Sequence, residues 1–149
     1  MPIQTPICDF GQKAHDFKLK STEGKILSLA DIKGEKGTLI MFICNHCPYV
    51  KAVTKDIVED CKKLKDIGIN SVAICANDAE NYPEDSFENM IKFSKENQFG
   101  FPYLVDETQE IAKTLIMKFF DISRDKPHIK LCIPPNSGGK VLVTIMYIN

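Results

Sequence analysis

The feature that most constrains the fold is an apolar run, Thr38–Ile43, that ends in the sequence C-N-H-C-P at residues 44–48. An unbroken apolar run of this kind is typical of a strand buried on both faces, usually a parallel strand covered by helices. Proline is favoured at the first position of a helix, because its missing N–H would have no intrahelical partner there. We therefore expect Cys47 at the N-cap of a helix that begins at Pro48.

The chain beyond this point alternates helices with strands. Apolar side chains recur at helical spacing from Val50 to Ile67, and Gly68 ends the pattern. Ile69–Ala76 is a second apolar run, and Gly100–Asp106 contains a short third strand. Strands that alternate with helices predict an α/β fold, in which helices cover the faces of a parallel sheet.

Two hairpins are expected outside this alternating region. Gly11–Leu29 places short apolar groups on either side of a turn at residues 21–25. His128–Ile133 and Lys140–Ile148 are two further apolar segments, joined by P-P-N-S-G-G. We expect these last two segments to form a terminal hairpin.

Composition excludes several classes of partner. The chain has 149 residues, which suits a single domain spanning residues 1–149, and its net charge is −1. Arg124 is its single arginine. These values favour neither a nucleic acid nor a membrane surface as partner. No apolar run reaches the length of a membrane span, and the first residues lack the features of a secretory signal. We therefore expect a cytoplasmic protein.

The six cysteines indicate reactive thiols rather than a disulfide framework. Thiols in the cytoplasm are kept reduced, so any disulfide there is usually transient and functional. At a helix N-cap, free N–H groups and the positive end of the helix dipole would face the sulfur of Cys47 and favour its thiolate. Because the carboxyl ends of parallel strands form sites, we expect this thiolate to be presented to solvent.

Other side chains near Cys47 have competing interpretations. Cys44 and Cys75 are either small core residues or thiols that resolve an oxidised Cys47. His46 either assists proton transfer or is a polar loop residue. A C-x-x-C pair is also half of a zinc site, but the sequence contains no second such pair. We therefore predict no metal and no organic cofactor.

Several segments together resemble one family. They are D-F-K-L-K-S-T-E-G-K-I-L-S-L-A-D-I-K-G, M-F-I-C-N-H-C-P-Y-V-K-A-V, N-D-A-E-N-Y-P-E-D-S-F-E-N-M and F-P-Y-L-V-D-E-T-Q-E-I-A-K-T, spread over residues 11–114. They are similar to thioredoxin-like proteins of the AhpC/TSA (redoxin) group, specifically bacterial members with the motif C-N-H-C-P-[FY]-V-K-A. The resemblance implies a thioredoxin-like fold, with a central mixed sheet flanked by helices, and thiol–disulfide or antioxidant peroxide chemistry.

The resemblance also bears on which cysteine attacks. Aligned with the F-W-A-x-W-C pattern of thioredoxins, Cys47 takes the attacking position. Aligned with the T-x-x-C pattern of peroxiredoxins, Cys47 matches the peroxidatic cysteine and Cys44 replaces the threonine. If residues 44–47 are instead the redox C-x-x-C itself, Cys44 attacks and Cys47 resolves. The position of Pro48 favours Cys47 as the nucleophile, with Cys44 as the resolving thiol and Cys75 in reserve.

The C-terminal part, residues 115–149, departs from the family pattern. Relatives continue into a T-P-D segment whose cis-proline faces the cysteines, whereas this chain reads L-I-M-K-F-F-D-I-S-R-D-K-P-H-I-K-L-C-I-P-P. Pro134 is a weak candidate for that proline, and Arg124 is the one arginine available for a peroxiredoxin-like role.

Two functions are consistent with these residues. The first is a cytoplasmic thiol–disulfide oxidoreductase that acts on protein or small-molecule disulfides, or on peroxides. Its reductant would be a thioredoxin-like protein or a low-molecular-weight thiol. The alternative is a redox-impaired thioredoxin-fold module that binds proteins, which the altered C-terminal part favours.

Overall fold

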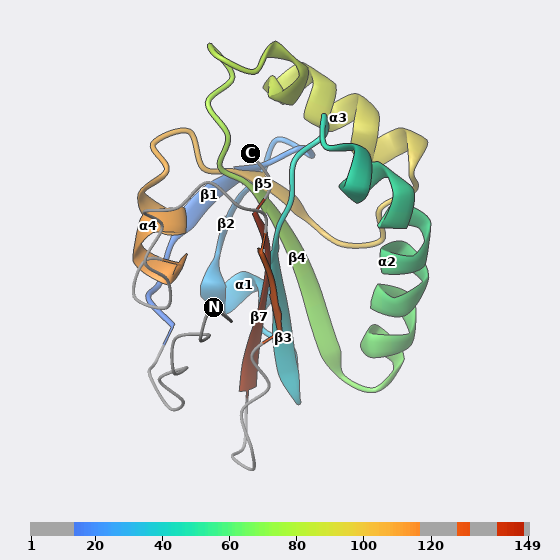
Figure 1. Cartoon of the computed structure of the whole chain (residues 1–149). Helices are drawn as coiled ribbons and strands as arrows, with labels where there is room; N and C mark the ends of the chain where they lie inside the picture. The colour runs from blue at the N-terminus through green and yellow to red at the C-terminus, as the bar shows by residue number, and fades with distance from the viewer. Residues whose placement is uncertain (1–13, 117–127, 132–139, 148–149) are drawn as a thin grey trace, which may run out of the picture.

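A computed structural model of the chain describes residues 14–116, 128–131 and 140–147. The described strands form one sheet, in the order β2-β1-β5-β4-β3-β7-β6. Helices lie on both of its faces (Figure 1). The strands are β1 (Lys18–Ser21), β2 (Ile26–Ser28), β3 (Gly37–Phe42), β4 (Ile69–Cys75), β5 (Tyr103–Val105), β6 (His128–Leu131) and β7 (Lys140–Tyr147).

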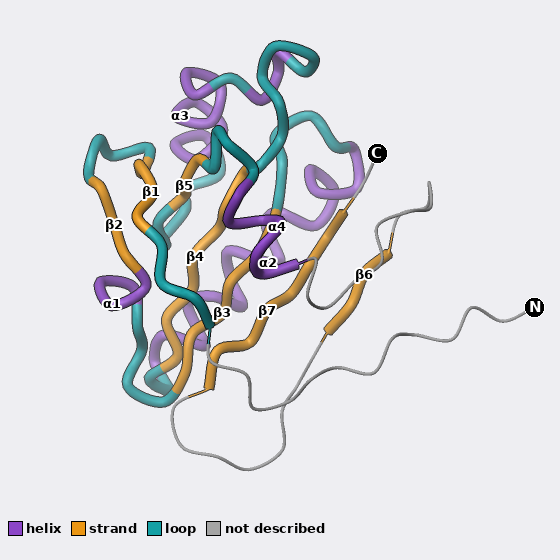
Figure 2. Tube along the Cα trace, turned by 90° about the vertical axis from the view of Figure 1, so that its left-hand side faces the viewer, coloured by secondary structure: helices purple, strands orange, loops and turns teal. Residues whose placement is uncertain are grey.

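The sheet is mixed, as the fold prediction requires. Strand β3 pairs in parallel with β4 on one side and β7 on the other, and β4 pairs in parallel with β5. The antiparallel pairs are β1 with β2, β1 with β5 and β6 with β7. Figure 2 shows the two hairpins at opposite edges of the sheet. Both predicted hairpins are therefore confirmed.

The helices are α1 (Leu29–Ile32), α2 (Pro48–Asp66), α3 (Phe87–Glu96) and α4 (Glu110–Ile116), and a short 3-10 helix, η1, spans Pro83–Asp85. Alternation along β3 divides the core into two layers. Leu39, Met41 and Ile43 pack with buried residues of α2 and α3. Ile40 and Phe42 pack with residues of α1 and α4 on the opposite face. Burial of β3 on both faces explains its unbroken apolar sequence.

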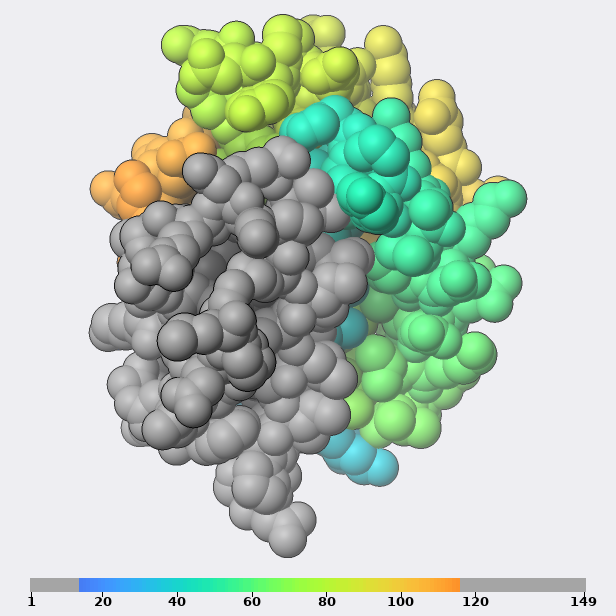
Figure 3. Space-filling model, viewed as in Figure 1, coloured from blue at the N-terminus to red at the C-terminus, as the bar shows by residue number. Residues whose placement is uncertain are grey.

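The carboxyl ends of β3 and β4 lie at the same edge of the sheet, because Phe42 pairs with Ile74 in the parallel register. The loop after β3 leads into α2, and the loop after β4 leads into η1 and α3. In the space-filling view the start of α2, in teal, adjoins the yellow-green segment that follows β4 (Figure 3). Two loops far apart in sequence therefore meet at one edge.

Candidate active site

Cys47 is the N-cap of α2 and Pro48 is its first residue, as the sequence predicted. The carbonyl of Cys47 accepts the N–H of Lys51 at 3.0 Å, the first backbone hydrogen bond of the helix. Its side chain makes no capping hydrogen bond. It is also only 1% exposed and packs in the apolar cluster that includes Leu39 and Val50. The prediction that this thiol is presented to solvent is therefore wrong, because the Cys47 side chain packs into the apolar core beneath the start of the helix.

Cys44 lies just beyond the end of β3 and is buried. Its sulfur accepts hydrogen bonds from the backbone N–H groups of His46 and Cys47, which links the ends of the C-N-H-C loop (residues 44–47). Burial nevertheless raises the pKa of Cys44 to about 11, and the nearby carboxylate of Asp85 acts in the same direction. Near neutral pH Cys44 is thus a thiol rather than a thiolate, which suits the resolving position better than the attacking one.

Cys75 ends β4 and is 1% exposed, in the same apolar cluster as Cys44 and Cys47. Its thiol shares a hydrogen bond with the hydroxyl of Tyr103, and burial raises its pKa to about 12. All three cysteines are free thiols. Cys75 thus lies in one apolar cluster with Cys44 and Cys47, and its packing at the end of β4 favours the structural interpretation.

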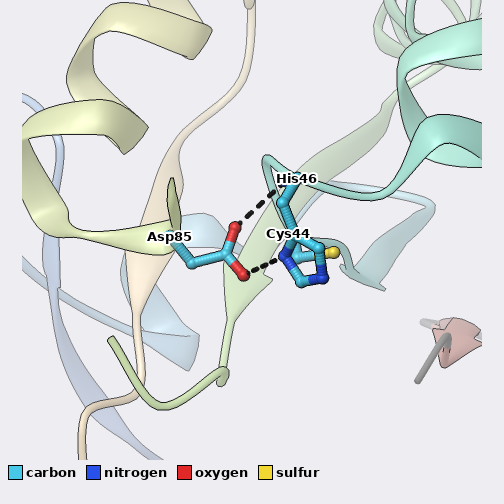
Figure 4. A group of neighbouring side chains, drawn as sticks. All are labelled: Cys44, His46 and Asp85. Atoms are coloured by element: carbon cyan, nitrogen blue, oxygen red, sulfur yellow. Dashed lines mark hydrogen bonds and ion pairs between the residues drawn. The ribbon is translucent and has the colours of Figure 1, made fainter. Parts of the chain in front are cut away.

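The central contact of the site is made by Asp85, at the end of η1, which sequence reasoning did not select. Its carboxylate is buried and accepts four hydrogen bonds. Oδ1 accepts the backbone N–H groups of Asn45 at 2.7 Å and His46 at 3.2 Å. Oδ2 lies 2.5 Å from Nδ1 of His46 and accepts Nδ2 of Asn77 at 2.7 Å. Three of these contacts come from the C-N-H-C loop, two of which Figure 4 shows as dashed lines.

Asn45 ties the same loop to two further elements. Its Nδ2 donates to the carbonyl of Glu84 at 3.2 Å, and its Oδ1 accepts the hydroxyl of Tyr103 at 2.9 Å. The Tyr103 hydroxyl also lies 3.4 Å from the carbonyl of Ile43. With its own N–H bound to Asp85, Asn45 is fixed from η1 on one side and β5 on the other.

The imidazole of His46 makes two contacts, a polar one through Nδ1 and a stacking one through its ring face. The edge that carries Nδ1 contacts Asp85, and the ring stacks on Tyr82 with 5.1 Å between centroids and 7° between planes. Its side chain remains 23% exposed. A carboxylate oxygen accepts, so the contact with Asp85 favours a proton on Nδ1, and in the neutral ring this fixes the tautomer. The other ring nitrogen is then left as an acceptor.

Cys44, His46 and Asp85 also provide a sulfur, a ring nitrogen and a carboxylate oxygen within 4.8 Å of one another. Such a mixed set is chemically suited to a transition metal. A carboxylate offers about four lone-pair sites, and at Asp85 all four are taken by N–H donors. A metal ion would have to displace one of these donors. The cluster is therefore arranged as a hydrogen-bond network that holds the loop.

Two residues named in the sequence analysis, Pro134 and Arg124, lie outside the described residues, as do the cysteines Cys8 and Cys132. In the described part of the chain, no helix is both long enough and apolar enough to cross a membrane.

The sequence model of the AhpC/TSA family matches residues 10–129. The chain belongs to the AhpC/TSA family. Comparison with curated proteins found no match.

Two solved structures from bacteria are similar in both sequence and fold. An uncharacterized conserved protein from Geobacillus kaustophilus is 46% identical with a TM-score of 0.70, and the match covers 76% of this chain and 61% of that one. The hypothetical protein SMc02350 from Sinorhizobium meliloti 1021 is 32% identical with a TM-score of 0.70, covering 75% of this chain and 62% of that one. The chain therefore spans about three fifths of the length of each of these two proteins.

A more distant structure confirms the fold alone. The thioredoxin domain of a thiol-disulfide oxidoreductase from Bacteroides vulgatus is 15% identical with a TM-score of 0.61. The match covers 93% of this chain and 88% of that one. The thioredoxin-like fold predicted from the motifs is therefore confirmed for this AhpC/TSA protein.

Proposed function

We propose that this AhpC/TSA protein is a thiol–disulfide oxidoreductase in which Cys47 attacks a disulfide and Cys44 resolves the product. The observation that carries the proposal is the position of the two cysteines. Cys47 occupies the N-cap position of α2, and the sulfur of Cys44 accepts the N–H of Cys47. The two thiols thus belong to one tight loop at the carboxyl edge of the sheet, which supports disulfide exchange between them as the proposed chemistry.

The reaction has two exchange steps. The Cys47 thiolate attacks one sulfur of a substrate disulfide, forming a mixed disulfide and releasing the other half as a thiolate. Cys44 then loses its proton and attacks the Cys47 sulfur, releasing the second half of the substrate. The protein ends as the Cys44–Cys47 disulfide and the substrate gains two electrons. A thioredoxin-like protein or a low-molecular-weight thiol in the cytoplasm would restore the dithiol.

The hydrogen-bond donors that a peroxide needs favour disulfides over peroxides as substrates. Peroxide cleavage requires hydrogen-bond donors that hold both peroxide oxygens in line with the thiolate. At the position where peroxiredoxins carry a threonine hydroxyl, this chain has Cys44, whose raised pKa of about 11 reflects its burial. A buried thiol is a weak donor in place of a hydroxyl. Sulfenic acid formation on Cys47 by a peroxide is the competing reaction.

Reduction of insulin disulfides, with a small thiol as the electron source, tests this function. The wild-type protein should accelerate insulin precipitation, and Cys47→Ser should abolish the acceleration. Cys61→Ser is the matched control, because Cys61 is a buried thiol on the same helix, α2, outside the C-N-H-C loop. A folded wild-type protein with no activity would favour the alternative, a binding module in which burial of Cys47 has suppressed exchange.

A further inference from the structure

The proposed cycle contains a step for which the cysteines alone do not account. Cys44 must give up a proton before it can attack the mixed disulfide, since the thiolate is the nucleophile. Its sulfur is buried beside a carboxylate, an environment that opposes ionisation. A proton acceptor next to Cys44 would remove this obstacle.

The imidazole of His46 is a candidate acceptor near this sulfur. A ring nitrogen of His46, a carboxylate oxygen of Asp85 and the sulfur of Cys44 lie within 4.8 Å of one another. In Figure 4 the second ring nitrogen and the Cys44 sulfur both lie on the side of the imidazole away from Asp85. A separation of up to 4.8 Å between the ring nitrogen and the sulfur is longer than a hydrogen bond. Such contacts often tighten, or are bridged by one water, in the reacting complex.

We propose that His46 accepts the proton of Cys44 in the resolving step, and that Asp85 is the positioning residue that prepares His46 for it. Asp85 favours the proton on Nδ1, so in the neutral imidazole the other nitrogen carries the lone pair that accepts a proton. Asp85 also fixes the backbone of Asn45 and His46, which sets the conformation of the loop that carries both thiols. The inference rests on the proposed function.

The proton and electrons balance through the step. Cys44 transfers its proton to His46 as its sulfur bonds to the Cys47 sulfur, and the bond between Cys47 and the substrate breaks. The departing thiolate takes the electron pair of that bond, and the imidazolium returns the proton to it as the free thiol. His46 ends the step neutral and ready for another cycle.

The pH dependence of the step depends on all of the groups that face it. His46 faces the carboxylate of Asp85 and the phenol ring of Tyr82. Four titratable groups interact electrostatically with Cys44. They are Asp85 of η1, Cys47 of the same loop, Cys75 of β4 and Tyr103 of β5. Burial keeps the last two protonated near neutral pH, with the pKa of Cys75 raised to about 12 and that of Tyr103 raised well above its usual value.

Stopped-flow reaction of the reduced protein with the aromatic disulfide DTNB separates the two steps. Attack by Cys47 releases one thionitrobenzoate, and resolution by Cys44 releases a second. The measurement uses a Cys8→Ser/Cys132→Ser background to simplify the signal. In Asp85→Asn, an amide N–H2 faces His46 and favours the wrong tautomer. We expect its second phase to slow by about tenfold or more relative to its first phase.

His46→Gln provides an independent test that does not depend on folding of the Asp85 variant. Its second phase should also slow by about tenfold or more, and should then accelerate about tenfold per pH unit above pH 7, following the thiolate fraction of Cys44. If His46→Gln slowed the second phase only by distorting the loop, the pH dependence of that phase would stay as in the wild type. Asp78→Asn, a substitution in the loop that precedes η1, should leave both phases unchanged.

The possible outcomes separate the two proposals. A wild-type protein without the first phase overturns the proposed function, and this inference with it. A normal first phase, together with a second phase that is unaffected in His46→Gln, overturns the inference alone. A slow second phase in His46→Gln with the steep pH profile supports it.

Discussion

The carboxylate of Asp85 accepts the backbone N–H of Asn45 at 2.7 Å, although 40 residues separate the two in sequence. This bond joins the segment after β4 to the loop after β3. Because that loop contains both Cys44 and Cys47, the geometry of the thiol pair depends on a residue from a different part of the chain.

Replacing Asp85 with alanine should destabilise the fold. The change leaves buried donors of Asn45 and His46 without an acceptor, and unpaired buried donors cost about 1–3 kcal/mol each. We expect a loss of about 2–4 kcal/mol in the free energy of unfolding, measured by urea titration. Asp78→Ala removes a carboxylate whose hydrogen bonds, within the described part of the chain, go to Glu80 and Asn81 of its own loop. If both variants lose the same stability, the Asp85 contacts do not hold the loop as described.

Stability should fall as pH rises above about 9, in part because of Cys75. The folded state keeps the Cys75 proton up to a pKa of about 12, whereas its ordinary value is 9.0. The folded state therefore binds more protons than the unfolded state between these values, and this contribution is lost as pH rises. The loss approaches roughly 1.4 kcal/mol per pH unit for one fully shifted group.

Urea unfolding of the wild type and of Cys75→Ala at pH 7, 9 and 10 measures this effect. The variant should lose less stability than the wild type between pH 9 and pH 10. Parallel pH profiles would contradict the assignment of the raised pKa to Cys75.

Tyr103→Phe should cost about 1–2 kcal/mol of stability. The hydroxyl that is lost donates to Oδ1 of Asn45 at 2.9 Å inside the core. Tyr49→Phe is the matched control, because Tyr49 is 68% exposed at the start of α2. Thermal unfolding of both variants checks the difference, and an unchanged midpoint for Tyr103→Phe would show that the hydroxyl contributes nothing.

Gly34→Ala should be destabilising by about 2–3 kcal/mol or prevent folding. A Cβ at Gly34 would lie 2.1 Å from the carbonyl oxygen of Gly37 and 2.6 Å from the backbone nitrogen of Asn70, both main-chain atoms that cannot turn away. The same change at Gly100 meets nothing within 4 Å and should have little effect on packing. Equal expression and equal melting temperatures for the two variants would contradict this close approach.

The sequence predicted the elements around Cys47 because their signals are local. The apolar run of β3, the proline at position 48 and the glycine after α2 each act within a few residues of their own position. The parallel pairing of β3 with β4 followed from the alternation of strands and helices. That pairing in turn brought Cys75 to the same edge as Cys44.

The sequence could not predict the contacts that assemble the site. Asp85 lies among several acidic and amide side chains in residues 77–85, and none of them differs from the others by local pattern. The selection of Asp85 depends on how η1 folds back onto the loop after β3, which is a tertiary event. The burial of Cys47 has the same origin, since local sequence specifies a helix start but not what packs over it.

The most direct test of the proposed roles of Cys44 and Cys47 is intact-mass analysis after reaction with a disulfide substrate, in variants that each replace one of these two cysteines. If Cys47 attacks and Cys44 resolves, Cys44→Ser should accumulate one stable mixed disulfide, mapped to Cys47 by peptide analysis. Cys47→Ser should accumulate none, because the raised pKa of about 11 keeps Cys44 protonated. A mixed disulfide that accumulates on Cys44 in the Cys47→Ser variant, with none on Cys47 in the other, would reverse the roles and contradict this account.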